Sequence, residues 1–226
     1  MPDVTVIQPD PLLPQYRWNP NARHGLGAHI DSNGRFVSRA TVRAELDNVI
    51  KGLGDQASTI TGQLKAGEVT LSDWQTQMMA ISKQSAMVGA VMQKGSWFNM
   101  TQSDFGRVGQ QVKEQYGFLR DWAKGIAEGV RKIHRGVARQ YAQFGRQVYY
   151  LFEKLKSRLG GLNERRNILH ARESCSGVGS CIEQNGLGWL SINDDQFIEI
   201  GRRVCRGNCL CTWEYRNSET GAKVTA

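Results

Sequence analysis

Residues 70–94 read TLSDWQTQMMAISKQSAMVGAVMQK, and this stretch decides the fold class. Thr70 followed three residues later by Asp73 has the spacing of a helix N-cap and its capping partner. Apolar residues then recur on one face of a helix: Trp74, Met78, Ile81, Val88 and Met92. A stripe of this kind is far more often a core face than a cofactor site. The stretch therefore predicts a helix that buries one face.

Both flanking segments carry the same helix signals. Downstream, residues 101–104 read TQSD, which repeats the capping spacing, and the chain from there to Leu159 is helical in pattern and free of proline. Upstream, Ser38 is a candidate N-cap. Apolar residues follow it at helical spacing: Val42, Leu46, Val49 and Leu53. The predicted fold is therefore mainly α, with a multi-helix body over residues 38–160.

Glycines interrupt the third helical segment. Seven fall between Gly106 and Gly145, and each costs about 1 kcal/mol relative to alanine inside a helix. Either breaks divide the segment, with a boundary near Gly125 or Gly129, or the glycines allow close packing within or between subunits. We expect both, with close approach of neighbouring subunits at Gly129 and Gly136.

The first 37 residues differ in character from the helical body. All five prolines fall in residues 1–20, and proline fixes φ and removes a backbone donor. Residues 1–23 are therefore expected to form an extended arm, either a disordered tail or a strap that orders on a neighbouring subunit. Within residues 30–37, Asn33-Gly34 between apolar residues predicts a hairpin.

The N-terminus and the hydropathy pattern bear on location. Residues 1–4 have no basic start and no apolar run follows them, which argues against a secretory signal. No run of about 18 apolar residues is present, so neither a transmembrane helix nor a membrane partner is expected.

Positive charge concentrates in residues 107–166, which hold fourteen Lys or Arg and five Asp or Glu, a net charge of +9. Aromatic residues are interleaved with the middle of this run. The pattern favours a helix that faces DNA or an acidic partner. The candidate contact residues are Arg131, Lys132, Arg135, Arg139 and Arg146. An ordinary solvated helix face explains the charge equally well, because charge runs on helices usually face solvent.

The five cysteines all lie in the last quarter of the chain: Cys175, Cys181, Cys205, Cys209 and Cys211. These two clusters, on glycine-rich loops, could converge on a tetrahedral zinc ion held by the first three and by either Cys209 or Cys211. A disulfide between the clusters and unmetallated buried thiols are the alternatives. An odd, clustered set in a chain without a secretion signal favours zinc.

Residues 161–226 are expected to form a small module around these cysteines. Gly160-Gly161 marks its boundary, and a short helical stretch is expected over residues 162–170. Residues 189–192, 197–200 and 212–216 read as short strands. So small a β-containing knuckle cannot bury a sufficient core, and a metal or a disulfide would supply the missing stability.

Several phrases of the sequence carry a resemblance to a known group. They are Cys175 with Cys181, Gly188-Trp189, residues 200–205, Asn208-Cys209-Leu210-Cys211 and residues 214–216. Together they resemble the end of phage minor head and head-morphogenesis proteins of the Mu F-like group, in which a cysteine pair precedes His-Pro-x-Cys-Arg-Cys. Here Leu210 replaces the arginine, Cys205 stands near the histidine position, and the first pair is more widely spaced. Residues 33–38, 73–75 and 100–109 resemble phrases of a narrower group of phage structural proteins.

The resemblance implies a minor capsid or head-assembly protein of a tailed bacteriophage. Such a protein would be assembled in the host cytoplasm, be present in the virion as an oligomer, and bind portal, major capsid or neck proteins and packaged DNA. No enzyme is expected, because no metal-plus-base, nucleophile-plus-base or phosphate-loop pattern stands out. The alternative function is a DNA-binding zinc protein with a regulatory role, although no helix-turn-helix or zinc-finger spacing is present.

Overall fold

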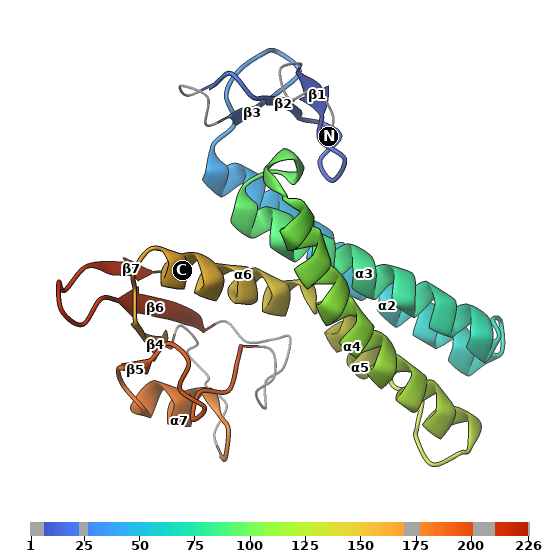
Figure 1. Ribbon diagram of the computed structural model, residues 1–226. Helices are drawn as coiled ribbons and strands as arrows, with labels where there is room; N and C mark the ends of the chain where they lie inside the picture. Colours follow the sequence, from blue (N-terminus) through green and yellow to red (C-terminus); the bar gives the residue numbers. More distant parts are fainter. Residues whose placement is uncertain (1–6, 23–26, 170–176, 201–210, 226) are drawn as a thin grey trace. The chain divides into compact units, whose positions relative to one another are not determined.

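The computed structural model describes residues 7–22, 27–169, 177–200 and 211–225 (Figure 1). The chain divides into two compact units, residues 1–145 and 146–226. The mainly helical class predicted from the sequence is confirmed, and small antiparallel sheets accompany the helices. The division falls at Gly145 rather than after Gly160, because α6 (Gly145–Leu159) contributes side chains to the core of the second unit.

Helices α2 (Arg39–Ala66) and α3 (Leu71–Lys94) form a helical hairpin. Ser38 and Thr70 cap them, since each side-chain oxygen accepts the backbone N–H three residues further on. Gly67 ends α2 with a φ of 76°, a left-handed conformation that glycine adopts without strain. The helix starts predicted from the sequence are therefore confirmed.

The 3-10 helix η1 (Trp97–Asn99) leads from α3 to α4 (Gln102–Ala127). Thr101 begins α4 as part of a complete capping box. Gly129, with a φ of 71°, follows the end of α4, as the sequence predicted for this region, and α5 (Arg135–Ala142) comes next. Across the described part of the chain, no helix combines the length and apolarity needed to cross a membrane.

Large side chains fill the core of the helical unit. Trp74 is fully buried, and its indole Nε1 donates to Thr61 Oγ1 at 2.9 Å. Trp122 meets Trp74 edge-on with ring centroids 5.0 Å apart, and Tyr141 stacks on Trp122 at 5.3 Å. Met78 is also fully buried. The Trp and Met stripe of α3 is therefore a core face, as predicted.

Close backbone approach occurs at Gly89 of α3. An added Cβ there would lie 1.8 Å from the carbonyl oxygen of Gly145, so the two backbones touch. The sequence predicted close approach at Gly129 and Gly136 in packing against other subunits, and that stays a prediction. Among the described residues nothing lies within 4 Å of a Cβ at Gly129, and at Gly136 only the ring of His134 does. Gly129 ends a helix, where its positive φ rather than its small size is required.

The N-terminal segment forms a small antiparallel sheet in the order β1 (Gln8–Pro9), β2 (Arg17–Asn19), β3 (Ala28–Ile30). It differs from the expected extended arm, because Leu13 is buried against side chains of α2 and α3 of the same chain. Pro9 lies in an edge strand, where a missing backbone donor is tolerated. The described part of this segment therefore packs within its own unit.

A buried polar pair lies inside this N-terminal sheet module. His29 Nε2 lies 2.8 Å from Asp10 Oδ2, and both side chains are almost fully buried. The other carboxylate oxygen of Asp10 accepts the backbone N–H groups of Leu12 and Leu13, at 2.8 and 3.2 Å. Trp18 meets His29 edge-on at 5.1 Å. Asp10 therefore connects the turn after β1 to β3.

The hairpin predicted for residues 30–37 is present in a minimal form. Ile30 and Phe36 make a single antiparallel bridge. Asp31 N donates to Arg35 O at 3.0 Å, and Gly34 has a φ of 77°, which the tight turn requires.

The second unit contains a four-stranded antiparallel sheet in the order β5-β4-β6-β7. Its strands are β4 (Glu164–Ile168), β5 (Leu190–Ser191), β6 (Thr212–Arg216) and β7 (Lys223–Thr225). The unit also contains the short helix α7 (Cys181–Gly186). The prediction of a short helix over residues 162–170 is wrong, because strand β4 occupies this position. Its inward residues Arg165 and Asn167 are polar, so no apolar alternation marks the strand in the sequence.

Candidate functional site

Two of the five cysteines lie in the described part of the second unit, and both are buried. Cys181 opens α7 and Cys211 directly precedes β6. Their exposures are 4% and 1%, and both belong to the hydrophobic cluster that contains Trp213 and Phe197. The structure therefore brings one residue of each predicted cysteine cluster into the same core.

Side chains from neighbouring elements hold the backbones of both cysteines. Asn167 Nδ2 of β4 donates to the carbonyl of Cys181 at 3.3 Å. The Tyr150 hydroxyl of α6 donates to the carbonyl of Cys211 at 3.1 Å. Ser180 also caps α7, immediately before its first residue. These hydrogen bonds fix the backbone positions of Cys181 and Cys211, and metal ligands need such fixed positions.

The remaining candidate ligands, Cys175, Cys205 and Cys209, lie outside the described residues. Within the described ranges, no three His, Cys, Asp or Glu side chains gather closely enough to hold a metal ion. The described residues thus offer two cysteines, and tetrahedral zinc needs four ligands. The zinc site therefore stays a prediction.

A buried polar cluster occupies the inner face of the sheet. Arg165, which is 1% exposed, donates two hydrogen bonds of 2.9 Å to the Glu199 carboxylate. Its guanidinium lies 4.3 Å from the ring centroid of Trp213 and 4.9 Å from that of Phe197. Lys154 of α6 adds an ion pair of 3.1 Å to the same carboxylate. The cluster therefore ties α6, β4 and the segment around Glu199 together.

The protonation states of this inner cluster are fixed near neutral pH. Burial alone would raise the pKa of the Glu199 carboxyl, but hydrogen bonds and charge from Arg165, helped by Lys154, hold that pKa below its ordinary value. Burial, with the charge of Glu153 adding to it, raises the pKa of the Tyr215 hydroxyl far above its ordinary value. Glu199 is therefore ionised and Tyr215 neutral, whereas proton-transfer catalysts have pKa values near the working pH.

Two of the predicted basic contact residues pack against α2. The Arg139 guanidinium pairs with Asp55 at 2.9 Å, and its aliphatic part lies 3.1 Å from the position of a Cβ on Gly54. The Arg135 guanidinium lies 2.2 Å from the position of a Cβ on Gly62. Glycines in α2 therefore make room for arginines of α5, which cover the helix as well as carrying charge.

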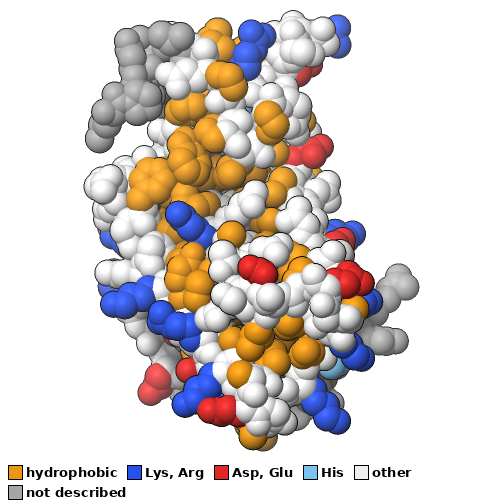
Figure 2. Space-filling view, turned by 90° about the vertical axis from the view of Figure 1, so that its right-hand side faces the viewer, with side chains coloured by type: hydrophobic (Ala, Val, Ile, Leu, Met, Phe, Trp, Pro, Cys, Tyr) orange, Lys and Arg blue, Asp and Glu red, His pale blue; other side chains and the backbone are white. Residues whose placement is uncertain are grey.

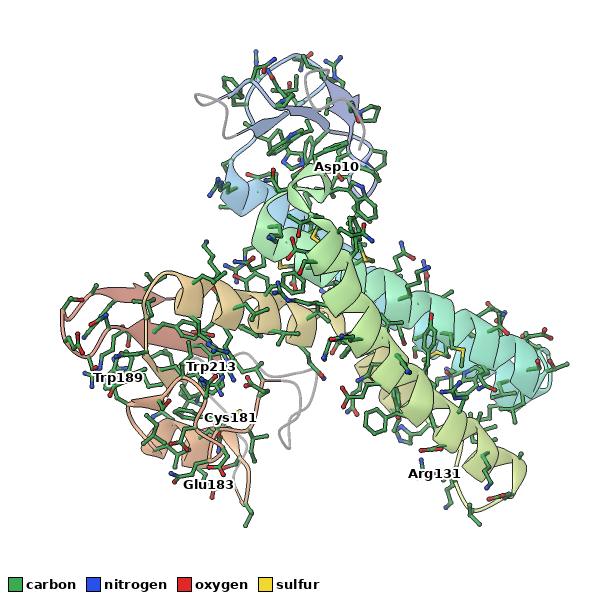
Figure 3. The ribbon with its side chains drawn as sticks, in the orientation of Figure 1. Asp10, Arg131, Cys181, Glu183, Trp189 and Trp213 are labelled. Atoms are coloured by element: carbon green, nitrogen blue, oxygen red, sulfur yellow. The ribbon has the colours of Figure 1, made fainter. Side chains whose placement is uncertain are left out.

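The other predicted basic residues occupy different settings. Arg131, labelled in Figure 3, lays its aliphatic stem on Gly125 of α4, and Lys132 beside it is exposed. Arg146 is half-buried on α6, in the second unit. On the face shown in Figure 2, Lys and Arg side chains are scattered among patches of hydrophobic side chains. DNA contact by these residues stays a prediction.

Sequence reasoning missed a group of cations on the outer face of the C-terminal sheet. Three cations lie over the indole ring of Trp189: Arg216 at 4.4 Å, Arg166 at 4.9 Å and Lys223 at 5.7 Å from the ring centroid. The four residues come from or adjoin four different strands, so no spacing along the sequence relates them. The polar positions that alternate with apolar ones in residues 212–216 were the available signal.

No family model, no curated protein and no solved structure matches this chain.

Proposed function

We propose that the protein is a structural component of a tailed-bacteriophage head. In this proposal it is not an enzyme, it assembles in the host cytoplasm with portal, capsid or neck proteins and with copies of itself, and it remains in the virion. The phrases at residues 33–38, 100–109 and 200–216 support the proposal through their resemblance to phage structural proteins.

The structural observation that supports this proposal is the use of polar side-chain pairs, each with at least one buried member, as ties between segments. Three of these pairs are Asp10–His29, Lys94–Asp104 and Arg165–Glu199, at 2.8, 2.8 and 2.9 Å. The first joins β1 to β3, the second joins α3 to α4, and the third joins β4 to the segment that follows β5. Buried polar pairs of this kind stiffen the fold, which suits a protein that serves as a scaffold in assembly.

The test is the protein's abundance in purified particles. Quantitative mass spectrometry of virions from the phage or prophage that encodes this chain should recover the protein at a fixed ratio to the major capsid protein. An amber mutation in its coding sequence should leave incomplete heads. Recovery from infected-cell extract alone, with normal heads in the amber mutant, would instead favour a regulatory DNA-binding protein.

We further propose one structural zinc ion per chain in the second unit. Its ligands would be Cys175, Cys181, Cys205 and either Cys209 or Cys211. The two described cysteines fit this role, since both are buried in one cluster and side chains of neighbouring elements hold their backbones. Bound zinc would join the two cysteine-bearing segments and add stability to a small unit.

Elemental analysis of protein produced under reducing conditions tests the zinc proposal. About one zinc per chain is expected, and the Cys181→Ser variant should bind less. The absence of stoichiometric metal, together with a cysteine crosslink mapped by mass spectrometry, would replace zinc with a disulfide.

A further inference from the structure

The outer face of the C-terminal sheet carries a cluster that neither proposal uses. Side chains alternate along β4 and β6, so Arg165 lies in the core while Arg166 and Arg216 are partly exposed on the other side. Trp189 adjoins β5 and Lys223 begins β7. The Trp189 cluster comprises Arg166, Trp189, Arg216 and Lys223, and Figure 3 labels Trp189.

Charge on this face is only partly compensated. Two glutamates share it, and each pairs with one arginine, Glu164 with Arg216 and Glu214 with Arg166, both at 2.6 Å. Lys223 lies directly opposite Arg216 in the β6–β7 register. In the described part of the chain, Lys223 forms no ion pair. Because Glu164 neutralises Arg216, Lys223 is the cation of this face whose charge no described carboxylate compensates.

The indole of Trp189 stands at the centre of these cations. The nearest guanidinium is 4.4 Å from its centroid, and the ring is only partly buried. Neighbouring strands lie about 4.8 Å apart, so the cations on β4, β6 and β7 form a short row across the sheet. These cations lie over the indole ring, glutamates neutralise the two arginines, and Lys223 supplies the remaining positive charge.

We propose that the Trp189 cluster binds single-stranded nucleic acid, with a base stacked on the indole and a phosphate between Lys223 and Arg216. Single-strand binding sites combine cations with an aromatic ring, and cation–π contacts from arginine contribute to them. A phosphate at this position would give Lys223 an anionic partner and would add a charge-assisted contact to Arg216. An acidic peptide would pair with Lys223 but would not stack on the partly buried indole, whereas a nucleobase can do so. The proposal does not rest on the virion assignment or on zinc.

Binding is tested with the full chain and a fluorescein-labelled oligodeoxythymidylate of about 15 residues, which is long enough for one site. Fluorescence anisotropy is measured at several salt concentrations. Trp189→Ala should weaken binding about tenfold, the order that one stacked base contributes, and Trp189→Phe should restore most of the loss. Lys223→Ala should weaken binding and reduce the slope of log K against log salt by about 0.7, the share of one phosphate contact.

Lys156→Ala is the matched control, because Lys156 is an exposed lysine on α6 of the same unit. It should change neither affinity nor salt slope, and circular dichroism should show every variant folded. Two results overturn the proposal: no binding by the wild type at low salt, or binding that Trp189→Ala and Lys223→Ala leave unchanged. Equal competition by a polyglutamate peptide of the same charge also overturns it and assigns the face to an acidic protein partner. None of these outcomes alters the composition of virions, so failure here is distinguishable from failure of the proposed function.

Discussion

At the scale of single residues, Arg165 determines what the inner face of the C-terminal sheet can hold. A guanidinium that is 1% exposed has lost its hydration, and in such a position it needs a neutralising partner and close packing. Glu199 neutralises it with two hydrogen bonds, and the rings of Trp213 and Phe197 pack against it. Removing the Glu199 carboxylate leaves the buried guanidinium without a neutralising partner, whereas Glu199 has a second partner in Lys154.

Glu199→Gln should therefore lower the free energy of unfolding by about 2 kcal/mol at neutral pH, below the usual cost for a fully buried pair because Glu199 is partly exposed. Folding lowers the pKa of this carboxyl, so the pair stabilises the fold above the ordinary pKa of 4.5 and is lost as the pH falls through the folded-state pKa. Urea unfolding between neutral pH and about pH 3 should show a steeper loss for the wild type than for the variant. Parallel curves would mean that the pair contributes nothing to acid sensitivity.

Asp10 offers a second test at this scale. Asp10→Ala removes the acceptor of two backbone N–H groups and the partner of His29, all in a buried setting, and should cost about 2 kcal/mol or more. Asp31→Ala is the matched control, since Asp31 Oδ1 accepts two backbone N–H groups at 2.9 Å in an exposed turn. Its cost should stay below about 1 kcal/mol because water replaces the lost bonds. Equal losses in thermal unfolding would show that burial of Asp10 has no energetic consequence.

At the scale of elements, glycine decides where two backbones can touch. Gly89→Ala should destabilise the helical unit by about 3 kcal/mol, because the new methyl group would meet the carbonyl of Gly145, which cannot move as a side chain can. Gly106→Ala is the control, since Gly106 lies within α4 with open space around it. It should stabilise by about 0.5 to 1 kcal/mol through helix propensity. Denaturant midpoints that shift in the same direction for both variants would contradict the contact.

The elements that the sequence predicted well are those with local signals. Helices α2, α3 and α4 begin where Ser38, Thr70 and Thr101 supply caps, because capping depends on residues three positions apart. Strand β4 was missed because Arg165 and Asn167 face inward, and the partners that make them tolerable lie far away in the sequence. The N-terminal sheet was missed because its prolines suggested an arm, whereas Pro9 occupies an edge position.

At the scale of the whole molecule, contacts between distant segments explain why the candidate sites were only partly predictable. The cysteines were identified by residue type alone, and the burial of Cys181 and Cys211 in one core agrees with two converging segments. The Trp189 cluster has no counterpart in sequence spacing, because Arg166 and Lys223 are brought together only by the strand order β4-β6-β7. Contacts of this kind depend on sheet topology, which local periodicity does not contain.

Each unit has its own cluster of buried side chains, one around Trp74 and Leu119 and the other around Trp213 and Tyr215. The second unit, residues 146–226, is close to the size at which a hydrophobic core alone is marginal. A zinc ion or a disulfide held by its cysteines should therefore stabilise this unit and leave the stability of the helical unit unchanged. Chelation under reducing conditions is expected to increase amide exchange in β4 and β6 while α2 and α3 keep their protection, and hydrogen-exchange mass spectrometry measures both at once.

Treatment with chelator alone and with reductant alone separates the two kinds of crosslink. Zinc predicts that the chelator is sufficient to increase exchange in β4 and β6, because removing the ion frees all of its ligands together. A disulfide predicts that reductant is required. If exchange in both strands stays unchanged under combined treatment, the packing of Trp213, Tyr215 and the Arg165–Glu199 pair is sufficient to hold the sheet. The cysteines would then be buried thiols in a unit that is stable without them.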